Sequence, residues 1–249
     1  MQVIAWPYPA RWAHRGAGKL APENTLAAIR HGASLGYTMF EFDVKLSADG
    51  ALILMHDPML ERTTDGRGRV AALGLGELSR LDAGSWHSPA YAGEGIPTLA
   101  RVARWLRAND CLANIEIKPC PGRERETGAA AALEAQALWA GAAVPPVLSS
   151  FSEDALAAAA LAAPRLPRAL LMDSVPADWA ARAQALGCVA IDVSHRHVDA
   201  ELIAQAHALG LKVLSYTVND PLRARMLLDW GLDGLITDAI DLIAPAPRL

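Results

Sequence analysis

The feature that most constrains the fold of this sequence is an alternation of two kinds of segment along nearly its whole length. Short apolar runs with β-branched residues are separated by Ala- and Leu-rich stretches of helical length. The alternation predicts repeated strand–helix units, which form a parallel sheet with helices outside it. The short runs number eight, which favours closure into a (β/α)8 TIM barrel; they are Arg11–His14, Met39–Leu46, Leu112–Lys118, Val147–Phe151, Ala169–Met172, Ala190–Ser194, Lys212–Val218 and Gly234–Thr237.

The longer stretches predict helices, and several of them end at a glycine, which is typical of helix C-termini. An open doubly wound sheet is the competing arrangement, but no GxGxxG motif opens a helix after the first expected strand. With 249 residues the chain has the size of one barrel, so we expect a single domain over residues 1–249. The expected helices include Asn24–Gly36, Thr127–Trp139, Glu153–Ala163, Ala177–Leu186, Asp199–Leu209 and Pro221–Trp230.

Two segments depart from the simple repeat. Residues 45–56 predict a hairpin that turns at the Asp49–Gly50 pair. A two-residue loop there would place Asp43 opposite His56, with the carboxylate and the imidazole on the same face. Residues 57–97 are Gly-rich and irregular, and a loop of that length inside a compact domain is usually functional. We therefore expect a small insertion after His56-Asp57 that covers one end of the barrel.

Composition excludes some classes of protein. Apolar residues make up 52% of the chain and charged residues 20%, which excludes intrinsic disorder. Lys and Arg total 23 against 27 Asp and Glu, a net charge of −4 that disfavours a nucleic-acid or anionic-membrane partner. The three cysteines are too few and too widely spaced for a disulfide framework, which favours a reducing compartment: Cys111, Cys120 and Cys188.

Neither a targeting signal nor a membrane span is expected. The N-terminal residues lack a basic region followed by an apolar one, so no signal peptide is predicted. The longest uncharged run, Ala135–Ser152, contains Gly141 and the Pro145–Pro146 pair, which interrupt a spanning helix. We expect a cytoplasmic protein, and the sequence does not distinguish a monomer from a homodimer.

Acidic residues occupy alternate positions of two expected strands. In residues 40–44 the apolar side chains face one way, which leaves Glu41 and Asp43 on the other face. Residues 114–118 repeat the pattern with Glu116 and Lys118. The apolar face of a barrel strand meets the helices, so the three carboxylates point inward, where they need compensation. A hard cation, Mg²⁺ or Ca²⁺, supplies it, and a Lys–Glu hydrogen-bond network is the alternative.

Two histidines and two positively charged side chains are expected near the same carboxylates. His14 and His56 end expected strands, and the carboxyl ends of strands form the active sites of barrels. Beside a cation, two histidines suit a general acid and a general base. Arg15 and Lys118 provide permanent positive charge for an anionic group such as a phosphate. The constellation predicts metal-assisted phosphoryl or related anion chemistry.

A few other polar residues have two interpretations each. Asn24 is a candidate cap of the first helix. Asn219 and Asp238 follow expected strands, where they can cap the next helix or reach a pocket. Asp192 and His195 suggest part of a catalytic triad, but no serine nucleophile elbow accompanies them, so we assign them no role.

The chain resembles the glycerophosphodiester phosphodiesterases, and most closely the short cytosolic bacterial form. The resemblance runs from about Arg11 to Ile243. It rests on ordered motifs at His14-Arg15-Gly16, Pro22-Glu23-Asn24-Thr25, Glu41-Phe42-Asp43, His56-Asp57, Glu116-Ile117-Lys118, Ser149-Ser150-Phe151, Tyr216-Thr217-Val218-Asn219, Asp233-Gly234 and Thr237-Asp238.

The resemblance implies a TIM barrel with an insertion after the His-Asp motif. It also implies hydrolysis of deacylated phospholipids, such as glycerophosphocholine and glycerophosphoethanolamine, to glycerol 3-phosphate and an alcohol. In that reaction Glu23 would orient Arg15, and many relatives have Trp at the position of Tyr216. Carried over by motif, a divalent cation would be held by Glu41, Asp43 and Glu116, the acid/base pair would be His14 and His56, and the phosphate would contact Arg15 and Lys118.

Two other functions compete with this one. A metal-dependent barrel isomerase or aldolase for phosphorylated sugars also needs carboxylates and a lysine, but it leaves the two strand-end histidines unexplained. A non-catalytic phosphate-binding barrel would be indicated if the acid/base histidines or the cation-binding carboxylates were replaced. All of these residues are present, which disfavours that function.

Overall fold

The computed structural model describes residues 6–246, and within them all eight expected strands form. They are joined by one further short strand, β3. The strands are β1 (Arg11–Ala13), β2 (Met39–Leu46), β3 (Leu52–Leu54), β4 (Leu112–Ile117), β5 (Val147–Ser150), β6 (Arg168–Met172), β7 (Ala190–Ser194), β8 (Lys212–Tyr216) and β9 (Gly234–Thr237).

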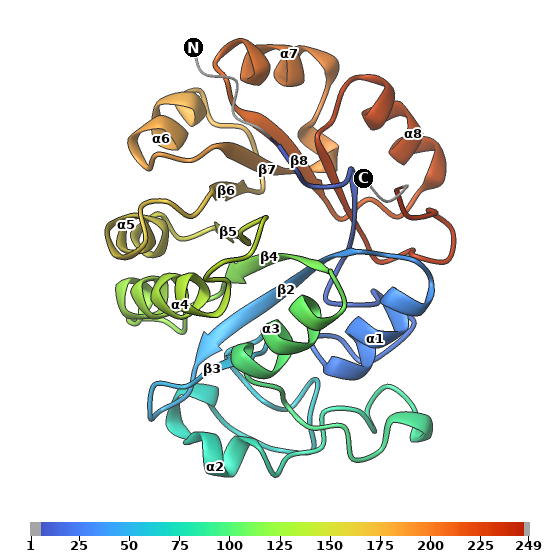
Figure 1. Cartoon of the computed structure of the whole chain (residues 1–249), viewed down its shortest axis with the longest axis vertical. Helices are drawn as coiled ribbons and strands as arrows, with labels where there is room; N and C mark the ends of the chain where they lie inside the picture. Colours follow the sequence, from blue (N-terminus) through green and yellow to red (C-terminus); the bar gives the residue numbers. More distant parts are fainter. Residues whose placement is uncertain (1–5, 247–249) are drawn as a thin grey trace.

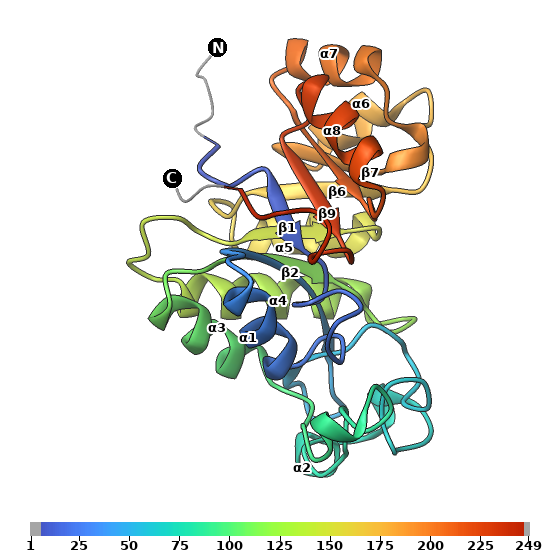
Figure 2. The ribbon, with the colours of Figure 1, turned by 90° about the vertical axis from the view of Figure 1, so that its right-hand side faces the viewer.

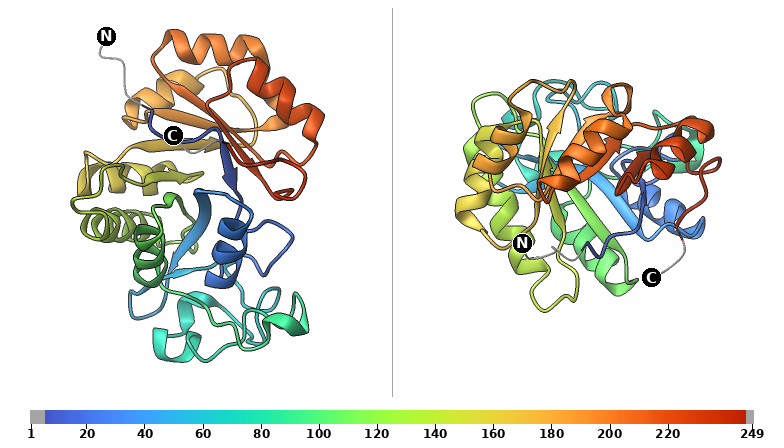
Figure 3. Two further views of the ribbon diagram at one scale, coloured as in Figure 1. Left: turned by 45° about the vertical axis from the view of Figure 1, so that its right-hand side comes forward. Right: turned by 90° about the horizontal axis from the view of Figure 1, so that it is seen from above.

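The strands form a closed barrel. Their order is β1-β9-β8-β7-β6-β5-β4-β2, every neighbouring pair is parallel, and β1 returns to pair with β2 at Ala13 and Phe40. β3 lies antiparallel on β2 at the edge of the barrel. Helices surround the strands on the outside (Figure 1, Figure 3). The predicted (β/α)8 TIM-barrel fold is confirmed.

The helices follow the strands in the expected order, and polar residues cap several of them. The side chains of Thr98, Ser152 and Asp199 each accept a hydrogen bond from a backbone N–H of the first turn. The helices are α1 (Leu26–Ser34), α2 (Leu75–Leu78), α3 (Leu99–Ala108), α4 (Glu124–Leu138), α5 (Glu153–Ala162), α6 (Trp179–Ala185), α7 (Ala200–Ala208) and α8 (Pro221–Asp229), with short 3₁₀ turns η1 (Val70–Ala72), η2 (Pro89–Tyr91) and η3 (His195–His197).

Apolar side chains fill both sides of the barrel wall. Outward-facing residues such as Phe40, Phe42 and Ile115 pack against the helices. Inside the barrel, Trp12, Met39, Val147, Leu214 and others form a separate apolar cluster. This inner cluster closes one end of the barrel, so a polar site is confined to the end where the strands finish.

Residues 57–97 form an insertion with little regular secondary structure, which Figure 2 shows projecting beside the barrel. It contains α2 and two 3₁₀ turns and packs around its own small apolar cluster, with Leu60, Val70 and Leu78 at its centre. An isolated bridge between Ile53 of β3 and Thr98 joins the chain just before the insertion to the chain just after it.

The predicted register of the β2–β3 hairpin is wrong by one residue. Val44 pairs with Leu54, and the backbone N–H of Met55, not that of His56, donates to the Asp43 carbonyl. The loop has three residues because Gly50 adopts φ +83°, and the Ser47 hydroxyl accepts from the N–H of Ala51. His56 lies beyond the end of the strand.

Within residues 6–246 no helix combines the length and the apolar character needed to cross a membrane.

Candidate active site

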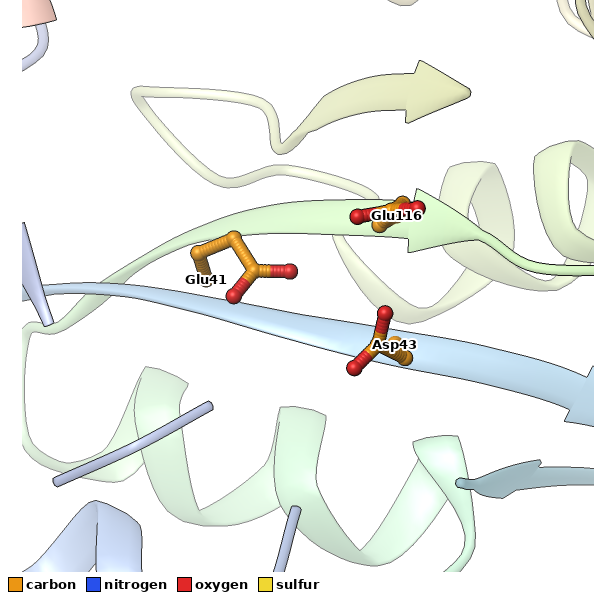
Figure 4. A group of neighbouring side chains, drawn as sticks. All are labelled: Glu41, Asp43 and Glu116. Carbon is orange, nitrogen blue, oxygen red and sulfur yellow. The ribbon is translucent and has the colours of Figure 1, made fainter. Parts of the chain in front are cut away.

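Three carboxylates from two adjacent strands meet inside the barrel. Glu41 and Asp43 lie on β2 and Glu116 on β4, and the strand register pairs Asp43 with Glu116. One ligand atom of each residue lies within 4.8 Å of the others, and all three side chains are buried. Figure 4 shows the three side chains gathered between the two strands. The alternation of apolar and acidic residues directs them to this face.

Burying these groups together changes their ionisation. Burial, together with the charge of Asp43, raises the pKa of Glu41 to about 8 and that of Glu116 to about 7. Burial would also raise the pKa of Asp43, but Arg15 and Lys118 outweigh it and hold that pKa below its usual range. The cluster therefore combines one carboxyl group that ionises readily, Asp43, with two that resist ionisation, Glu41 and Glu116.

The donor set suits a hard divalent cation. Glu41 Oε1 and Asp43 Oδ1 are buried and have no hydrogen-bond partner within the described residues. Carboxylate oxygens are the ligands that Mg²⁺ and Ca²⁺ prefer. The alternative network is only partly formed, because Lys118 Nζ lies 2.7 Å from Glu116 Oε1 but 3.8 Å from Asp43 Oδ1.

Each histidine beside the carboxylates is held by an aspartate. Asp238 Oδ1 lies 2.6 Å from His14 Nδ1, and Asp57 Oδ1 lies 2.6 Å from His56 Nδ1. An aspartate at Nδ1 places the proton of a neutral imidazole there and leaves Nε2 for the pocket. His14 Nε2 lies 3.7 Å from Glu41.

Their surroundings shift the two histidine pKa values in opposite directions. Burial would lower the pKa of His14, but the hydrogen bond to Asp238 and the charge of Glu41 raise it. Burial lowers the pKa of His56, and the charge of Asp43 offsets this only in part. Pairs of titratable groups with opposed shifts are characteristic of acid/base sites.

The positively charged side chains of Arg15 and Lys118 complete the lining of one pocket of about 220 Å³. Arg15 has φ +49°, and its guanidinium lies 2.8 Å from Glu23 and 3.4 Å from Asp43. The structure thus brings together all seven residues selected from the sequence. Those that line the pocket are His14, Arg15, Glu41, His56, Glu116 and Lys118, and Asp43 lies directly behind them.

Comparison with known proteins identifies the family of this chain. Residues 14–242 match the model of the glycerophosphoryl diester phosphodiesterase family. The chain belongs to this family. A glycerophosphodiester phosphodiesterase of Caldanaerobacter subterraneus subsp. tengcongensis is 33% identical over 91% of the chain and 92% of its own length. The predictions of the family and of an enzyme are confirmed.

Solved structures of the same family are similar over nearly the whole chain. An Oleispira antarctica phosphodiesterase, solved in complex with the product sn-glycerol-3-phosphate, is 36% identical with a TM-score of 0.87 and 93% of each chain covered. A glycerophosphodiester phosphodiesterase of Agrobacterium tumefaciens is 28% identical, with a TM-score of 0.81 over 95% of this chain and 99% of its own.

For some polar residues around the candidate site, the structure shows contacts that the sequence left open. Asn24 does not cap α1: the cap is Thr25, whose hydroxyl accepts from Ala28. Asn24 instead donates to the Asp43 carboxylate and accepts from the Asp43 N–H. Its φ of +58° turns the side chain away from the helix and toward β2.

Asp238 and Asn219 also serve the site. Asn219 donates to Asp238 Oδ2 and accepts from the Asp238 N–H, while Asp238 holds His14. The cap of α8 is the next residue, Asp220. Their position after two strands pointed to this place, but only the closed barrel brings β9 beside β1.

One arginine of the insertion was missed. Arg62 makes two hydrogen bonds to Asp57 and two to Glu23, at 2.6–3.0 Å. Asp57 holds His56 and Glu23 holds Arg15, so one guanidinium connects both sides of the candidate site. No periodicity could have indicated this contact, because 39 residues separate Arg62 from Glu23.

Proposed function

We propose that the protein hydrolyses glycerophosphodiesters to glycerol 3-phosphate and an alcohol, with a divalent cation, Mg²⁺ or Ca²⁺, as cofactor. The observation that carries the proposal is the buried carboxylate cluster facing two Asp-held histidines in one pocket. The product complex of the Oleispira antarctica relative supports a small-molecule substrate of this class. We further propose that residues 1–249 act as one catalytic domain, with the insertion contributing to the rim of the site.

The cation would be held by Glu41, Asp43 and Glu116. When bound, it supplies positive charge that stabilises the charge developing on the phosphate oxygens. Asn24 and Lys118 hold Asp43 and Glu116 by hydrogen bonds, so the carboxylates are oriented before any ligand arrives. Such orientation reduces the cost of reorganisation during the reaction.

Arg15 and Lys118 bind the phosphate in this proposal. The guanidinium of Arg15 is fixed by Glu23, and the ammonium of Lys118 by Glu116, so both charges are placed at the pocket wall. A planar guanidinium and a flexible ammonium together suit the several oxygens of a phosphodiester.

His14 and His56 are the acid/base pair. One of them takes the proton of the nucleophile at Nε2, and the other gives a proton to the departing alcohol. The nucleophile is water or the glycerol 2-hydroxyl, and attack by the hydroxyl would give a cyclic phosphate that water then opens. A diester without that hydroxyl separates the two routes, because undiminished turnover excludes the intramolecular attack.

The direct test is release of glycerol 3-phosphate from glycerophosphocholine. We expect release with Mg²⁺ or Ca²⁺, loss of release on addition of a chelator, and recovery when the cation is restored. Activity that a chelator does not change would contradict the cation assignment. Absence of product with either ion would contradict the proposed reaction.

A histidine variant tests the acid/base pair. His56→Ala should lower kcat by about 10²–10⁴-fold, the usual contribution of general acid–base catalysis. The matched control is His197→Ala, which removes an exposed imidazole of η3 that lies outside the pocket. Normal turnover by His56→Ala would remove His56 from the mechanism.

A further inference from the structure

Two buried polar side chains inside the pocket have no assigned partner. Asp192 on β7 is fully buried, and neither carboxylate oxygen accepts a hydrogen bond from the described residues. Asn114 on β4 is 1% exposed, and both its amide nitrogen and its amide oxygen lack partners in the same part of the chain. Both residues line the pocket that holds the histidines and carboxylates.

Both residues lie beside the apolar cluster that closes the barrel: Asn114 pairs in register with Val147, and Asp192 pairs with Leu214. Asn114 precedes Glu116 by two residues on β4 and is the register partner of Glu41, so it lies at the inner end of the carboxylate cluster. The neighbouring lining residues, Leu171 and Ile236, are apolar. Ile236 belongs to the apolar cluster that closes the barrel, so the pair lies at the floor of the pocket.

Leaving these groups without partners is costly. A buried polar group without a hydrogen bond destabilises a fold by about 1–3 kcal/mol, and native proteins contain few of them. An apolar side chain of similar size would fill the space at Asp192 more favourably. Buried polar groups without hydrogen bonds are unfavourable for stability, and their presence in a pocket indicates a ligand that supplies the missing hydrogen bonds.

The chemistry of the pair selects the kind of ligand. A phosphate is excluded from the floor, because the positive charges lie elsewhere on Arg15 and Lys118. The carboxyl oxygens of Asp192 can accept hydrogen bonds, and the amide of Asn114 can both donate and accept them. Alcohol hydroxyls match this pair, and Leu171 and Ile236 match the carbon atoms that bear them.

We propose that Asp192 and Asn114 form a hydroxyl-binding subsite that holds the glycerol end of the diester at the pocket floor. The inference rests on the proposed function and specifies how its substrate is oriented. The phosphate then lies between Arg15 and Lys118, and the leaving alcohol points to the rim. Phe151 at that rim is 40% exposed and meets the ring of Tyr216 edge-on at 5.7 Å.

Binding, measured separately from turnover, tests this subsite. Calorimetry on the full chain with Ca²⁺ compares three ligands: sn-glycerol 3-phosphate, n-propyl phosphate without hydroxyls, and phosphocholine with a cationic end. The wild type should bind sn-glycerol 3-phosphate at least about tenfold more tightly than n-propyl phosphate, the equivalent of one hydrogen bond. Asp192→Leu should remove most of that difference, and Asp192→Asn, which keeps an acceptor, should retain part of it.

Stability provides an independent readout. Asp192→Leu should raise the Tm while it weakens binding of sn-glycerol 3-phosphate, a combination that a purely structural residue would not show. The matched control is Ser215→Ala on the adjacent strand β8, whose buried hydroxyl donates to Val193. That variant should leave the preference for sn-glycerol 3-phosphate over n-propyl phosphate unchanged.

Three results would overturn the subsite. They are equal wild-type affinity for sn-glycerol 3-phosphate and n-propyl phosphate, an unchanged preference in Asp192→Leu, or a loss confined to phosphocholine, which would place the cationic headgroup at the floor. Failure of the proposed function looks different: the wild type would then neither bind sn-glycerol 3-phosphate nor release it from glycerophosphocholine.

Discussion

Three carboxylates with ligand atoms within 4.8 Å of one another destabilise the folded chain unless positive charge offsets them. Lys118 and Arg15 supply part of that charge, but Glu41 and Glu116 keep raised pKa values. The residues proposed to bind the cation are therefore also the residues whose ionisation would depend most on it.

This dependence predicts a pH-dependent stabilisation by the cation. Without cation, folded Glu41 keeps its proton up to a pKa of about 8, whereas the unfolded chain releases it near its ordinary value. The stability due to the bound proton is therefore complete at low pH and is lost as the pH rises through that interval. A bound cation replaces the proton, so its stabilising effect should increase over the same interval.

Thermal unfolding with and without saturating Ca²⁺ at pH 5 and pH 8.5 measures the effect. At 100-fold excess over Kd we expect a gain in Tm of roughly 5–10 °C at pH 8.5 and a clearly smaller gain at pH 5. Glu116→Gln should reduce the gain at pH 8.5. A gain independent of pH, or larger at pH 5, would show that the cation does not bind these carboxylates.

One arginine of the insertion links two carboxylates that hold residues of the candidate site. Arg62 binds Asp57 and Glu23 by two hydrogen bonds each, and these two carboxylates orient His56 and Arg15. Residues that orient a catalytic group in this way typically contribute 10–100-fold. The insertion, which has its own apolar cluster, thereby influences the barrel without lining the pocket at Arg62.

Arg62→Ala should lower kcat/KM about tenfold or more. Its hydrogen bonds lower the pKa of Asp57, so the acidic limb of the pH–rate profile should move to higher pH in the variant. Arg62→Lys cannot form both paired contacts and should recover only part of the loss. The control is Arg80→Ala, an exposed arginine of the insertion, and an equal loss in that variant would count against a specific role for Arg62.

Helix packing around the barrel depends on a close approach between α4 and α5. A Cβ atom at Gly128 would lie 2.1 Å from the Ala155 carbonyl oxygen. Gly128→Ala should therefore destabilise the fold by about 1–3 kcal/mol, although alanine is the better helix former. Thermal unfolding checks this against Gly76→Ala in α2, where nothing lies within 4 Å and no loss is expected. An equal or higher Tm for Gly128→Ala would contradict the close contact.

The sequence predicted the strand carboxylates of the site, but it did not predict the hairpin register or the contacts of Arg62. Strand alternation directed Glu41, Asp43 and Glu116 inward, because side-chain direction along a strand has a fixed period. The hairpin register failed because Gly50 extends the loop by one residue, and turn type is a local detail that one Asp-Gly pair does not specify. Arg62 needed tertiary structure, because its partners lie up to 39 residues away.

Over the whole molecule, the barrel closes at its shortest junction. β1 meets β2 only at Ala13 and Phe40, whereas the ladder between β2 and β4 runs from Met39 to Val44. Site residues supplement this junction: the Arg15 N–H donates to Glu41, and Asn24 binds Asp43. These polar contacts thus join the segment between β1 and α1 to β2.

Hydrogen exchange should detect this shared role. Addition of Ca²⁺ should slow amide exchange in segments 8–16 and 39–45 more than in α7, which lies far along the chain from the junction. Mass spectrometry of peptides from the exchanged protein resolves the segments. Protection spread evenly over all helices and strands would contradict a local effect at the junction.

A barrel whose closure depends on its own catalytic pocket has a particular failure mode. Separation of β1 from β2 displaces His14 and Arg15 while the other strands keep their ladders. Heating the enzyme at a cation concentration well below saturation should therefore abolish turnover at a temperature where circular dichroism still reports nearly full helix content. Inactivation would precede denaturation, and the interval between the two would shrink as cation is added.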